Sequence, residues 1–201
     1  MSVTPAGAVD ATNGGVVVRA MRPSDVDAAL ALINAYAAED RMLVRTREFL
    51  MERVGDFFVA DHAATRAFQG CVALAVLTPD LAEIRSLAVR PDSSGRGIGR
   101  ALVAACVEEA RRTGLRRVFA LTLVPEFFER CGFTLVSLGR LPEKSAAECP
   151  ICPKRGRCDE HAMLLHLDGT KPERLRSDEP VGYTRLMELS PDIARGIGPS
   201  S

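Results

Sequence analysis

Hydrophobic and polar positions near the start of the chain predict one strand and two helices. The β-branched run from Val16 to Ala20 favours a strand. A second, shorter helix is predicted for Thr46 to Arg53. The first helix is predicted between these segments, because apolar residues recur there at helical spacing: Val26, Ala29, Leu30, Ile33 and Ala37.

Three strand-like runs follow, and we expect them to form an antiparallel meander. They cover Asp56 to Asp61, Gly70 to Leu77 and Ala82 to Val89, with turn-forming residues between them. A loop from Ser93 to Gly97 then leads into a helix, which Gly114 is placed to end. The apolar side of this helix consists of Leu102, Val103, Cys106, Val107 and Ala110.

The remaining pattern predicts shorter elements. Arg117 to Thr122 favours a strand and Pro125 to Arg130 a short helix, and two closing strands are expected at Phe133 to Leu138 and Ala162 to Leu167. The segment between the closing strands is irregular and holds three of the six cysteines. Thr184 to Leu189 fits one or two helical turns.

These elements predict an α+β fold, with a mixed and mostly antiparallel sheet of about six to seven strands flanked by about four helices. We expect a flexible leader at residues 1–15, one domain at 16–167, and a partly disordered tail at 168–201. No internal repeat or second domain is expected.

Composition and charge narrow the classes of function. The 201 residues are 47% hydrophobic and 26% charged, as in an ordinary globular protein. Lys plus Arg equals Asp plus Glu, so no overall field favours nucleic acid or a membrane surface. The longest apolar runs are strand-sized, and Met1 to Gly15 does not resemble a secretory signal. We therefore expect a cytoplasmic protein whose six cysteines are thiols or metal ligands.

The strongest candidate for a ligand site is the glycine-rich loop before the long helix. Gly95, Gly97 and Gly99 allow successive N–H groups to converge, and the helix dipole adds positive potential, so a pyrophosphate is the expected ligand. The alternative is a tight turn into a helix without a ligand. A dinucleotide-binding fold is disfavoured, because its loop follows the first strand rather than about the fourth.

The residues around this loop resemble a known family. Leu87 to Pro91, followed by Gly95 to Leu102, resembles motif A of the GNAT N-acetyltransferases, and Phe127 to Phe133 is similar to motif B. Ser94 stands where the family has Arg or Gln. The resemblance implies a GNAT fold with acetyl-CoA as cosubstrate.

The resemblance also implies roles for individual residues. The backbone of Leu87, Ala88 and Val89 would pair with the pantetheine arm, and the amide near Leu87 would stabilise the developing oxyanion. The pyrophosphate would be held by Gly95, Arg96, Gly97, Ile98, Gly99 and Arg100.

The predicted general base is Glu83, on the strand that leads to Leu87. Strict alternation would place Glu83, Arg85 and Leu87 on one face. The alternative is that Glu83 is a solvated or salt-bridged strand residue. The family often uses a Tyr to protonate the departing thiolate, but the matching residue is Phe128, so that role is unassigned.

Within the family, the sequence is most similar to the acetyltransferase domain of short, kinase-less N-acetylglutamate synthases. The similar stretches are Arg41 to Thr46, Asp56 to Ala60, Ala82 to Val89 and Val118 to Thr122. The resemblance implies acetylation of the α-amine of glutamate, the first step of arginine biosynthesis.

Two carboxylates on the substrate would need fixed cations. By resemblance, Leu43 and Arg45 bind the substrate, and Arg85 is a second cationic candidate. The alternative is that both arginines are surface residues. Where longer synthases have an Arg-x-Ser pair, this chain has Cys158 to Glu160, so glutamine or another amino acid stays open.

Other functions also stay open. The same fold could act on a peptide N-terminus, a polyamine or an antibiotic. A non-catalytic acetyl-CoA-binding protein or a zinc-bearing adaptor is a rival of another class, favoured by Ser94 and Phe128. The oligomeric state is open, a homodimer included.

The cysteine-rich segment has two competing interpretations besides simple packing. Cys149, Cys152 and Cys158 with His161 could close a tetrahedral zinc site, or the thiols could be redox-sensitive. The spacing matches no common zinc finger, so a tight loop without metal is preferred. We assign no metal, and expect the other cysteines to pack in the core: Cys71, Cys106 and Cys131.

Overall fold

The computed structural model describes residues 15–183. Residues 1–14 of the predicted leader lie outside this range. So do the helical turns predicted at Thr184 to Leu189. The chain divides into two compact units, one formed by residues up to 76 and 82–115, the other by 77–81 and those from 116 on. The predicted boundaries at residues 15 and 167 stay a prediction.

The first unit contains four strands in sequential order: β1 (Val16–Ala20), β2 (Phe57–His62), β3 (Phe68–Thr78) and β4 (Leu81–Val89). The pairs β1–β2 and β2–β3 are antiparallel, and a two-residue turn joins β3 to β4. The antiparallel meander is therefore confirmed. The turn itself, with the strand ends at residues 77–81, belongs to the second unit.

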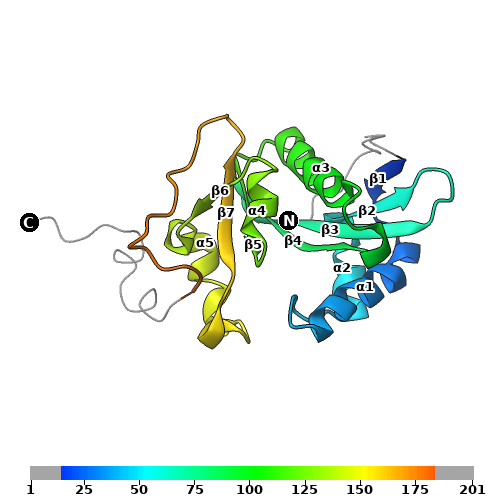
Figure 1. The fold of residues 1–201 in the computed structure, drawn as a ribbon, viewed down its shortest axis with the longest axis horizontal. Helices are drawn as coiled ribbons and strands as arrows, with labels where there is room; N and C mark the ends of the chain where they lie inside the picture. Colours follow the sequence, from blue (N-terminus) through cyan, green and yellow to red (C-terminus); the bar gives the residue numbers. More distant parts are fainter. Residues whose placement is uncertain (1–14, 184–201) are drawn as a thin grey trace, which may run out of the picture. The chain divides into compact units, whose positions relative to one another are not determined.

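Three helices complete the first unit. The helices α1 (Val26–Ala38) and α2 (Arg47–Glu52) lie on one face of its strands and α3 (Ile98–Arg112) on the other (Figure 1). Alternate residues of β2 explain the side that α1 and α2 cover, because Phe57 and Val59 point to one face. The core on that face includes Val26, Ala29, Ile33, Leu50, Phe57, Val59, Cys71 and Ala73.

A single glycine, Gly114, ends the helix α3. Gly114 has a φ of +77°, which favours glycine. Its N–H donates to Arg111 O at 3.1 Å, and the N–H of Leu115 donates to Ala110 O at 2.9 Å. These two bonds form a Schellman motif, with Leu115 buried behind it. The predicted C-terminal cap is confirmed.

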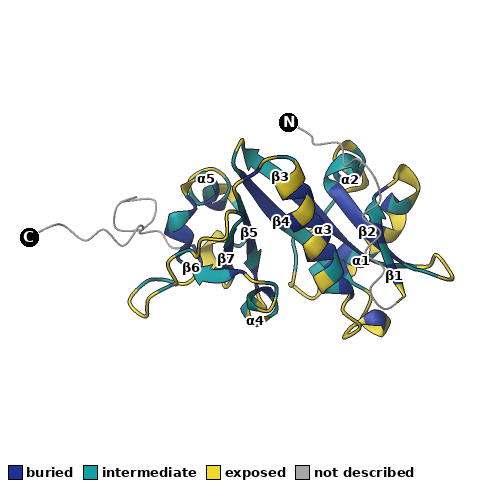
Figure 2. Ribbon diagram, turned by 90° about the horizontal axis from the view of Figure 1, so that it is seen from above, coloured by how far each residue is buried: buried dark blue, intermediate teal, exposed yellow. Residues whose placement is uncertain are grey.

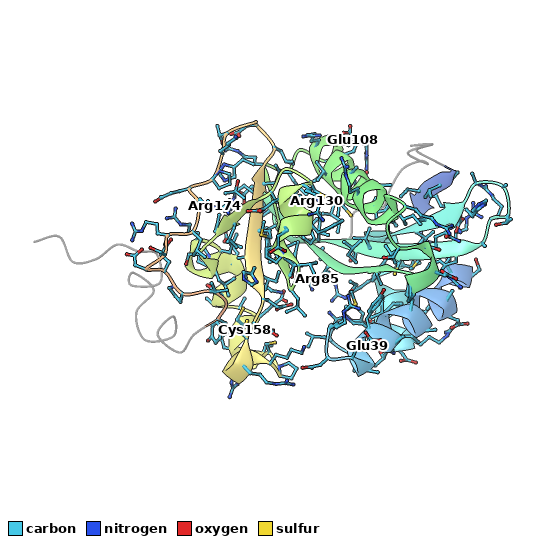
Figure 3. All side chains as sticks on the ribbon, viewed as in Figure 1. Glu39, Arg85, Glu108, Arg130, Cys158 and Arg174 are labelled. Atoms are coloured by element: carbon cyan, nitrogen blue, oxygen red, sulfur yellow. The ribbon has the colours of Figure 1, made fainter. Side chains whose placement is uncertain are left out.

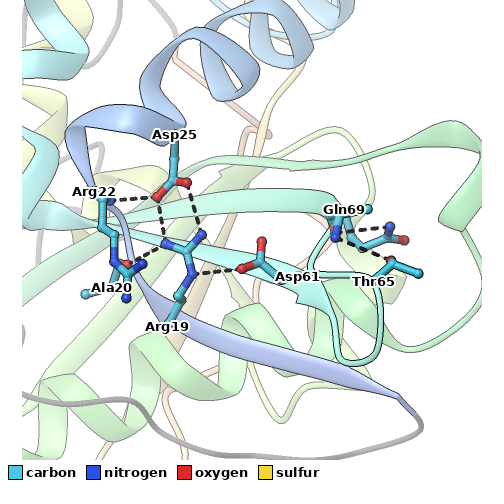
Figure 4. A network of polar contacts seen from close by, with 8 residues as sticks. Arg19, Ala20, Arg22, Asp25, Asp61, Thr65 and Gln69 are labelled. Carbon is cyan, nitrogen blue, oxygen red and sulfur yellow. Dashed lines mark hydrogen bonds and ion pairs between the residues drawn. The ribbon is translucent and has the colours of Figure 1, made fainter.

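A charged network joins β1 to β2 and to the turn before α1 (Figure 4). The Arg19 guanidinium donates to both carboxylate oxygens of Asp25, at 2.7 and 3.0 Å, and to Asp61 at 2.8 Å. The side chain of Asp61 is 4% exposed. Arg19 therefore supplies the counter-charge for a buried carboxylate.

The second unit contains three strands in the order β5, β7, β6. These are β5 (Arg117–Thr122), β6 (Thr134–Val136) and β7 (His161–His166), and both neighbouring pairs are antiparallel. The helix α4 (Pro125–Glu129) packs against β7 and β6. The buried residues of this unit (dark blue in Figure 2) include Leu81, Phe119, Val136, Leu138, Leu141, Cys149, Ala162, Leu164 and Tyr183.

Two features differ from the predicted elements. The strand expected at Phe133 to Leu138 is only β6, because Leu138–Arg140 turns as a 3₁₀ helix. The segment expected to be irregular contains α5 (Pro142–Ser145), a one-turn helix with proline at its first position. The described residues thus form seven strands and five α-helices, and the α+β prediction is confirmed.

Residues 168–183, which we call the strap, lie against the second unit. The N–H of Leu175 donates to Leu135 O at 2.8 Å, beside β6 at the end of the strand order. Glu173 pairs with Arg140 at 2.8 Å, and Tyr183 is 6% exposed in the core. The strap therefore covers part of an edge strand and adds a ring to the core.

The cysteines mostly pack in the interior. Cys71 and Cys106 are buried as predicted, whereas Cys131 is only partly buried. Cys149 lies in the core of the second unit, and burial raises the pKa of its thiol to about 12. Within residues 15–183, no group of three Cys, His, Asp or Glu is arranged to hold a metal ion. Among those residues, no helix is both long and apolar enough to span a bilayer.

Candidate active site

The carboxylate of Glu83 lies in the middle of β4 and is 5% exposed. Its partner is Arg85, labelled in Figure 3, whose Nη2 donates to Glu83 Oε2. The two side chains share one face of the strand, as alternation predicts. An ion pair of this kind holds the carboxylate in one orientation.

Regular alternation does not continue beyond Arg85. Ser86 has a φ of +54°, in the left-handed region that is rare for a residue with a side chain. The prediction that Leu87 shares a face with Glu83 therefore cannot rest on strict alternation. Backbone strain of this kind clusters where a site needs a peptide group in an unusual direction.

The backbone at the end of β4 is held from two sides. The Tyr36 hydroxyl on α1 donates to Val89 O at 2.6 Å. On the β3 side, a Cβ on Gly70 would lie 2.6 Å from Ala88 O, so only glycine fits there without movement. Neither Tyr36 nor Gly70 was predicted from the sequence to have a role at the site. A glycine inside a strand pattern was the available signal for Gly70.

The loop after β4 contains a run of amides without a bonded acceptor among the described residues. Ser93 N donates to Arg90 O and Ser94 N to Pro91 O, which shapes the turn. Gly95 and Gly97 have φ of +78° and +80° and are exposed. Within the described part of the chain, no acceptor is bonded to the N–H groups of Gly95 to Arg100. Converging amides at the start of a 15-residue helix suit an anion.

The charges around this loop are of both signs. Arg90 Nη2 lies 2.7 Å from Asp92 Oδ2. Hydrogen bonds from Arg90 and Ser93 lower the pKa of Asp92 to about 2. Arg96 and Arg100 are exposed on the loop and the first turn of α3. The cations outnumber the single carboxylate, which favours a phosphate group.

In the segment between α1 and α2, Arg45 is partly buried and held by several contacts. Arg45 N donates to Asn34 Oδ1 at 2.9 Å, and Asn34 Nδ2 donates to Arg45 O at 3.0 Å. The Arg45 guanidinium lies over the Phe49 ring, 4.9 Å from its centroid. Leu43 is partly buried in the same segment. These contacts hold Arg45 in one conformation, and its role as a substrate-binding residue stays a prediction.

A second cation, not predicted from sequence, lies beside Arg45. The Arg53 guanidinium is 5.0 Å from the centroid of the same Phe49 ring, and one of its nitrogens is 4.0 Å from Asp56. Burial raises the pKa of Asp56, although Arg53 and Arg85 oppose this effect. The first unit thus contains a buried carboxylate, a loop of unbonded amides and two arginines on one ring.

The comparisons with known proteins identify the family. Residues 53–135 match the acetyltransferase (GNAT) domain model. An uncharacterised N-acetyltransferase of Chlorobaculum tepidum is 42% identical over 75% of this chain and 96% of its own length. The chain belongs to the GNAT acetyltransferase family. This GNAT protein is therefore an acetyl-CoA-dependent N-acetyltransferase.

Two further relatives of this GNAT enzyme have informative names. An amino-acid acetyltransferase of Mycobacterium tuberculosis is 45% identical over 59% of this chain and 68% of its own. The N-acetylglutamate synthase of Neisseria gonorrhoeae, complexed with coenzyme A and N-acetyl-glutamate, has a TM-score of 0.69 and 30% identity. That match covers 78% of this chain and 36% of the synthase.

The GNAT motif B of this enzyme has a packing role at Phe128. Its ring is 4% exposed. It meets Phe127 and Phe133 edge-on, at centroid distances of 5.1 and 5.4 Å. Because the ring has no hydroxyl and points into the core, Phe128 cannot protonate a leaving thiolate.

Proposed function

We propose that this GNAT enzyme transfers the acetyl group of acetyl-CoA to the α-amine of an amino acid, with glutamate as the principal acceptor. This reaction would be the first step of arginine biosynthesis and would take place in the cytoplasm. The observation that carries the proposal is the fixed Arg45, because a planar guanidinium held at its backbone and over a ring can receive a carboxylate bidentately.

The proposed cosubstrate site combines the loop and the end of β4. The backbone N–H groups of this loop would donate to the pyrophosphate, because they have no other bonded acceptor in the described structure. They are those of Gly95, Arg96, Gly97, Ile98, Gly99 and Arg100. The exposed side chains of Arg96 and Arg100 add positive charge. The backbone of Leu87, Ala88 and Val89 would align the pantetheine arm.

The proposed acceptor site is built on the α1–α2 connection. Arg45 would bind one carboxylate of the amino acid, with Leu43 beside its aliphatic part. Arg53 lies on the same ring and would add positive charge for the second carboxylate. Arg85 would contribute mainly by holding Glu83, because its guanidinium is already paired with that carboxylate.

The chemistry requires a neutral amine. Glu83 would accept the ammonium proton directly or through one water, and the amine nitrogen would then form a bond to the acetyl carbonyl carbon. The amide of Leu87 would donate to the carbonyl oxygen as negative charge develops. The carbon–sulfur bond breaks and CoA leaves as a thiolate. The acylated nitrogen loses its extra proton, which passes through water to the thiolate, since Phe128 has none to give.

A panel of acceptors tests this proposal. Release of the CoA thiol is measured with glutamate, glutamine, other amino acids, a peptide, and a polyamine. We expect glutamate to have the highest kcat/KM, and Arg45→Lys to raise its KM about tenfold or more while the KM of acetyl-CoA stays unchanged. The control is Arg47→Lys, since Arg47 is exposed and pairs with Asp27. Turnover of the peptide or polyamine with inert glutamate and glutamine would contradict the proposal.

A preference for glutamine over glutamate would change the identity of the acceptor and leave the rest of the proposal in place. Glutamine has one carboxylate, so its selection would mean that Arg45 binds the α-carboxylate and that no cation is set for a second one. In that case Arg53→Gln should leave the KM for glutamine unchanged, whereas it should raise the KM for glutamate several-fold if glutamate is the acceptor.

A further inference from the structure

Ser93 is the single buried residue between Arg90 and Gly97. Its side chain is turned away from solvent, and the residue is 3% exposed. The Ser93 hydroxyl donates to Gln69 Oε1 at 2.5 Å and also lies 3.0 Å from Asp92 Oδ1. A buried hydroxyl inside an exposed loop needs a hydrogen-bond partner, because burying it unsatisfied destabilises the fold.

Gln69 is the extra residue of a bulge in β3. Phe68 pairs with Asp61 on β2 and Gly70 pairs with Ala60, so Gln69 has no partner in that register. Its carbonyl instead accepts from Arg90 N at 2.8 Å, at the first residue of the loop. Its amide group donates to Ala67 O at 3.4 Å, which leaves Oε1 oriented toward Ser93. Bulges commonly redirect a side chain toward a site.

Both partners of the Gln69–Ser93 hydrogen bond are therefore held in place by the surrounding structure. The backbone of Gln69 holds the start of the loop, and its side chain holds the loop's buried serine, two residues before the first glycine. Neither residue belongs to the run of unbonded amides from Gly95 to Arg100. Their effect on a phosphate must act through the loop's conformation.

We propose that Gln69 and Ser93 are positioning residues for acetyl-CoA, forming a latch that sets the Gly95–Gly97 amides for the pyrophosphate. This inference rests on the proposed function of that loop. Two of the four residues after Ser93 are glycines, so the backbone of this loop has many accessible conformations. The latch removes part of this freedom before binding, and preorganisation of this kind increases affinity without a new contact to the ligand.

The test uses Ser93→Ala, Gln69→Leu and the double variant of the full chain. CoA binding is measured by titration calorimetry, and kcat and KM are measured for acetyl-CoA and for the acceptor. We expect each single variant to raise the Kd of CoA and the KM of acetyl-CoA about 3- to 10-fold. The kcat at saturation and the acceptor KM should stay within about twofold. The double variant should be no weaker than either single one, because each removes the same bond.

Ser24→Ala is the matched control, since Ser24 is an exposed serine on the turn before α1. It should leave all these values unchanged. Lower thermal stability of Ser93→Ala with an unchanged Kd for CoA would assign the pair a structural role only and overturn the inference. Multiplied losses in the double variant would also overturn it. Failure of the unsubstituted chain to bind CoA would instead remove the proposed function itself.

Discussion

At the scale of single residues, the proposed reaction depends on the pair Glu83 and Arg85. Sequence alternation predicted that both lie on one face, and the hydrogen bond between them confirms it. This pairing is compatible with both roles predicted for Glu83 from the sequence, a general base and a structural ion pair. Kinetic and stability measurements can separate the two roles. Loss of a general base lowers kcat, whereas loss of a structural ion pair lowers the stability of the fold.

Glu83→Gln tests the base. Glutamine keeps the shape and an acceptor for Arg85 but cannot take a proton at neutral pH. We expect kcat to fall about 100-fold or more, with the Kd of CoA unchanged. The kcat–pH profile should also lose its acidic limb. A kcat within about threefold of the original, together with a lower melting temperature, would assign Glu83 to the ion pair alone.

At the scale of elements, the approach of β3 to β4 depends on Gly70. A Cβ there would lie 2.6 Å from Ala88 O and 3.2 Å from Val89 Cα, both of which are backbone atoms. Gly70→Ala should therefore push the end of β4 away, lowering the free energy of unfolding by about 1–3 kcal/mol. The KM of acetyl-CoA should rise as well. Denaturant unfolding and steady-state kinetics measure the two effects.

Gly156→Ala is the matched control for that prediction. A Cβ on Gly156 would meet no heavy atom within 4 Å, and its φ is not in the left-handed region. Its free energy of unfolding should change by less than about 0.5 kcal/mol. Equal effects of the two substitutions would show that the contact with Ala88 is not the cause.

The network of Arg19, Asp25 and Asp61 predicts a pH dependence. Burial works to raise the pKa of Asp25, but hydrogen bonds from Arg19 and Arg22 outweigh burial and hold that pKa below 3.8. A lowered folded-state pKa stabilises the protein above pH 3.8, and this stabilisation is lost as the pH falls through the folded-state pKa. Acid should therefore weaken the connection between β1 and the turn before α1.

Asp25→Asn measures this contribution. We expect the free energy of unfolding to fall by about 2 kcal/mol at pH 7, because a charge-assisted bidentate pair is lost. The difference from the original protein should shrink as the pH falls below 3.8. Asp27→Asn is the control, since its partner Arg47 and its own side chain are exposed, and it should cost less than about 1 kcal/mol. A pH-independent difference would contradict the assignment.

At the scale of the whole molecule, the described chain forms two units, each with its own core. The residues assigned to the site lie in the first unit. The second contains motif B, the cysteine segment and the strap. Within the cysteine segment, Cys149 belongs to the core of this unit.

The strap should be part of the stable fold rather than an appended tail. Tyr183→Ala removes a buried ring and should lower the free energy of unfolding by about 3 kcal/mol. Tyr183→Phe, which keeps the ring, should cost less than about 1.5 kcal/mol. Chemical denaturation measures both values. An alanine variant as stable as the original would show that the strap does not contribute to folding.

The sequence by itself determined the elements and the family. The bounds of β1 and β5 and the cap of α3 follow from local patterns, because burial period and glycine placement are properties of neighbouring residues. Motif A located the loop for the same reason. The candidate residues Glu83 and Arg45 were also within reach of sequence comparison.

Only the tertiary structure decided how those residues are held. The Asn34 clamp on Arg45, the Tyr36 bond to Val89 and the Gln69 latch on Ser93 join positions 11, 53 and 24 residues apart. The left-handed Ser86 and the bulge at Gln69 shift strand register, which alternation assumes to be constant. Such contacts depend on the register between elements, and hydrophobic periodicity reports only which face of each element is buried.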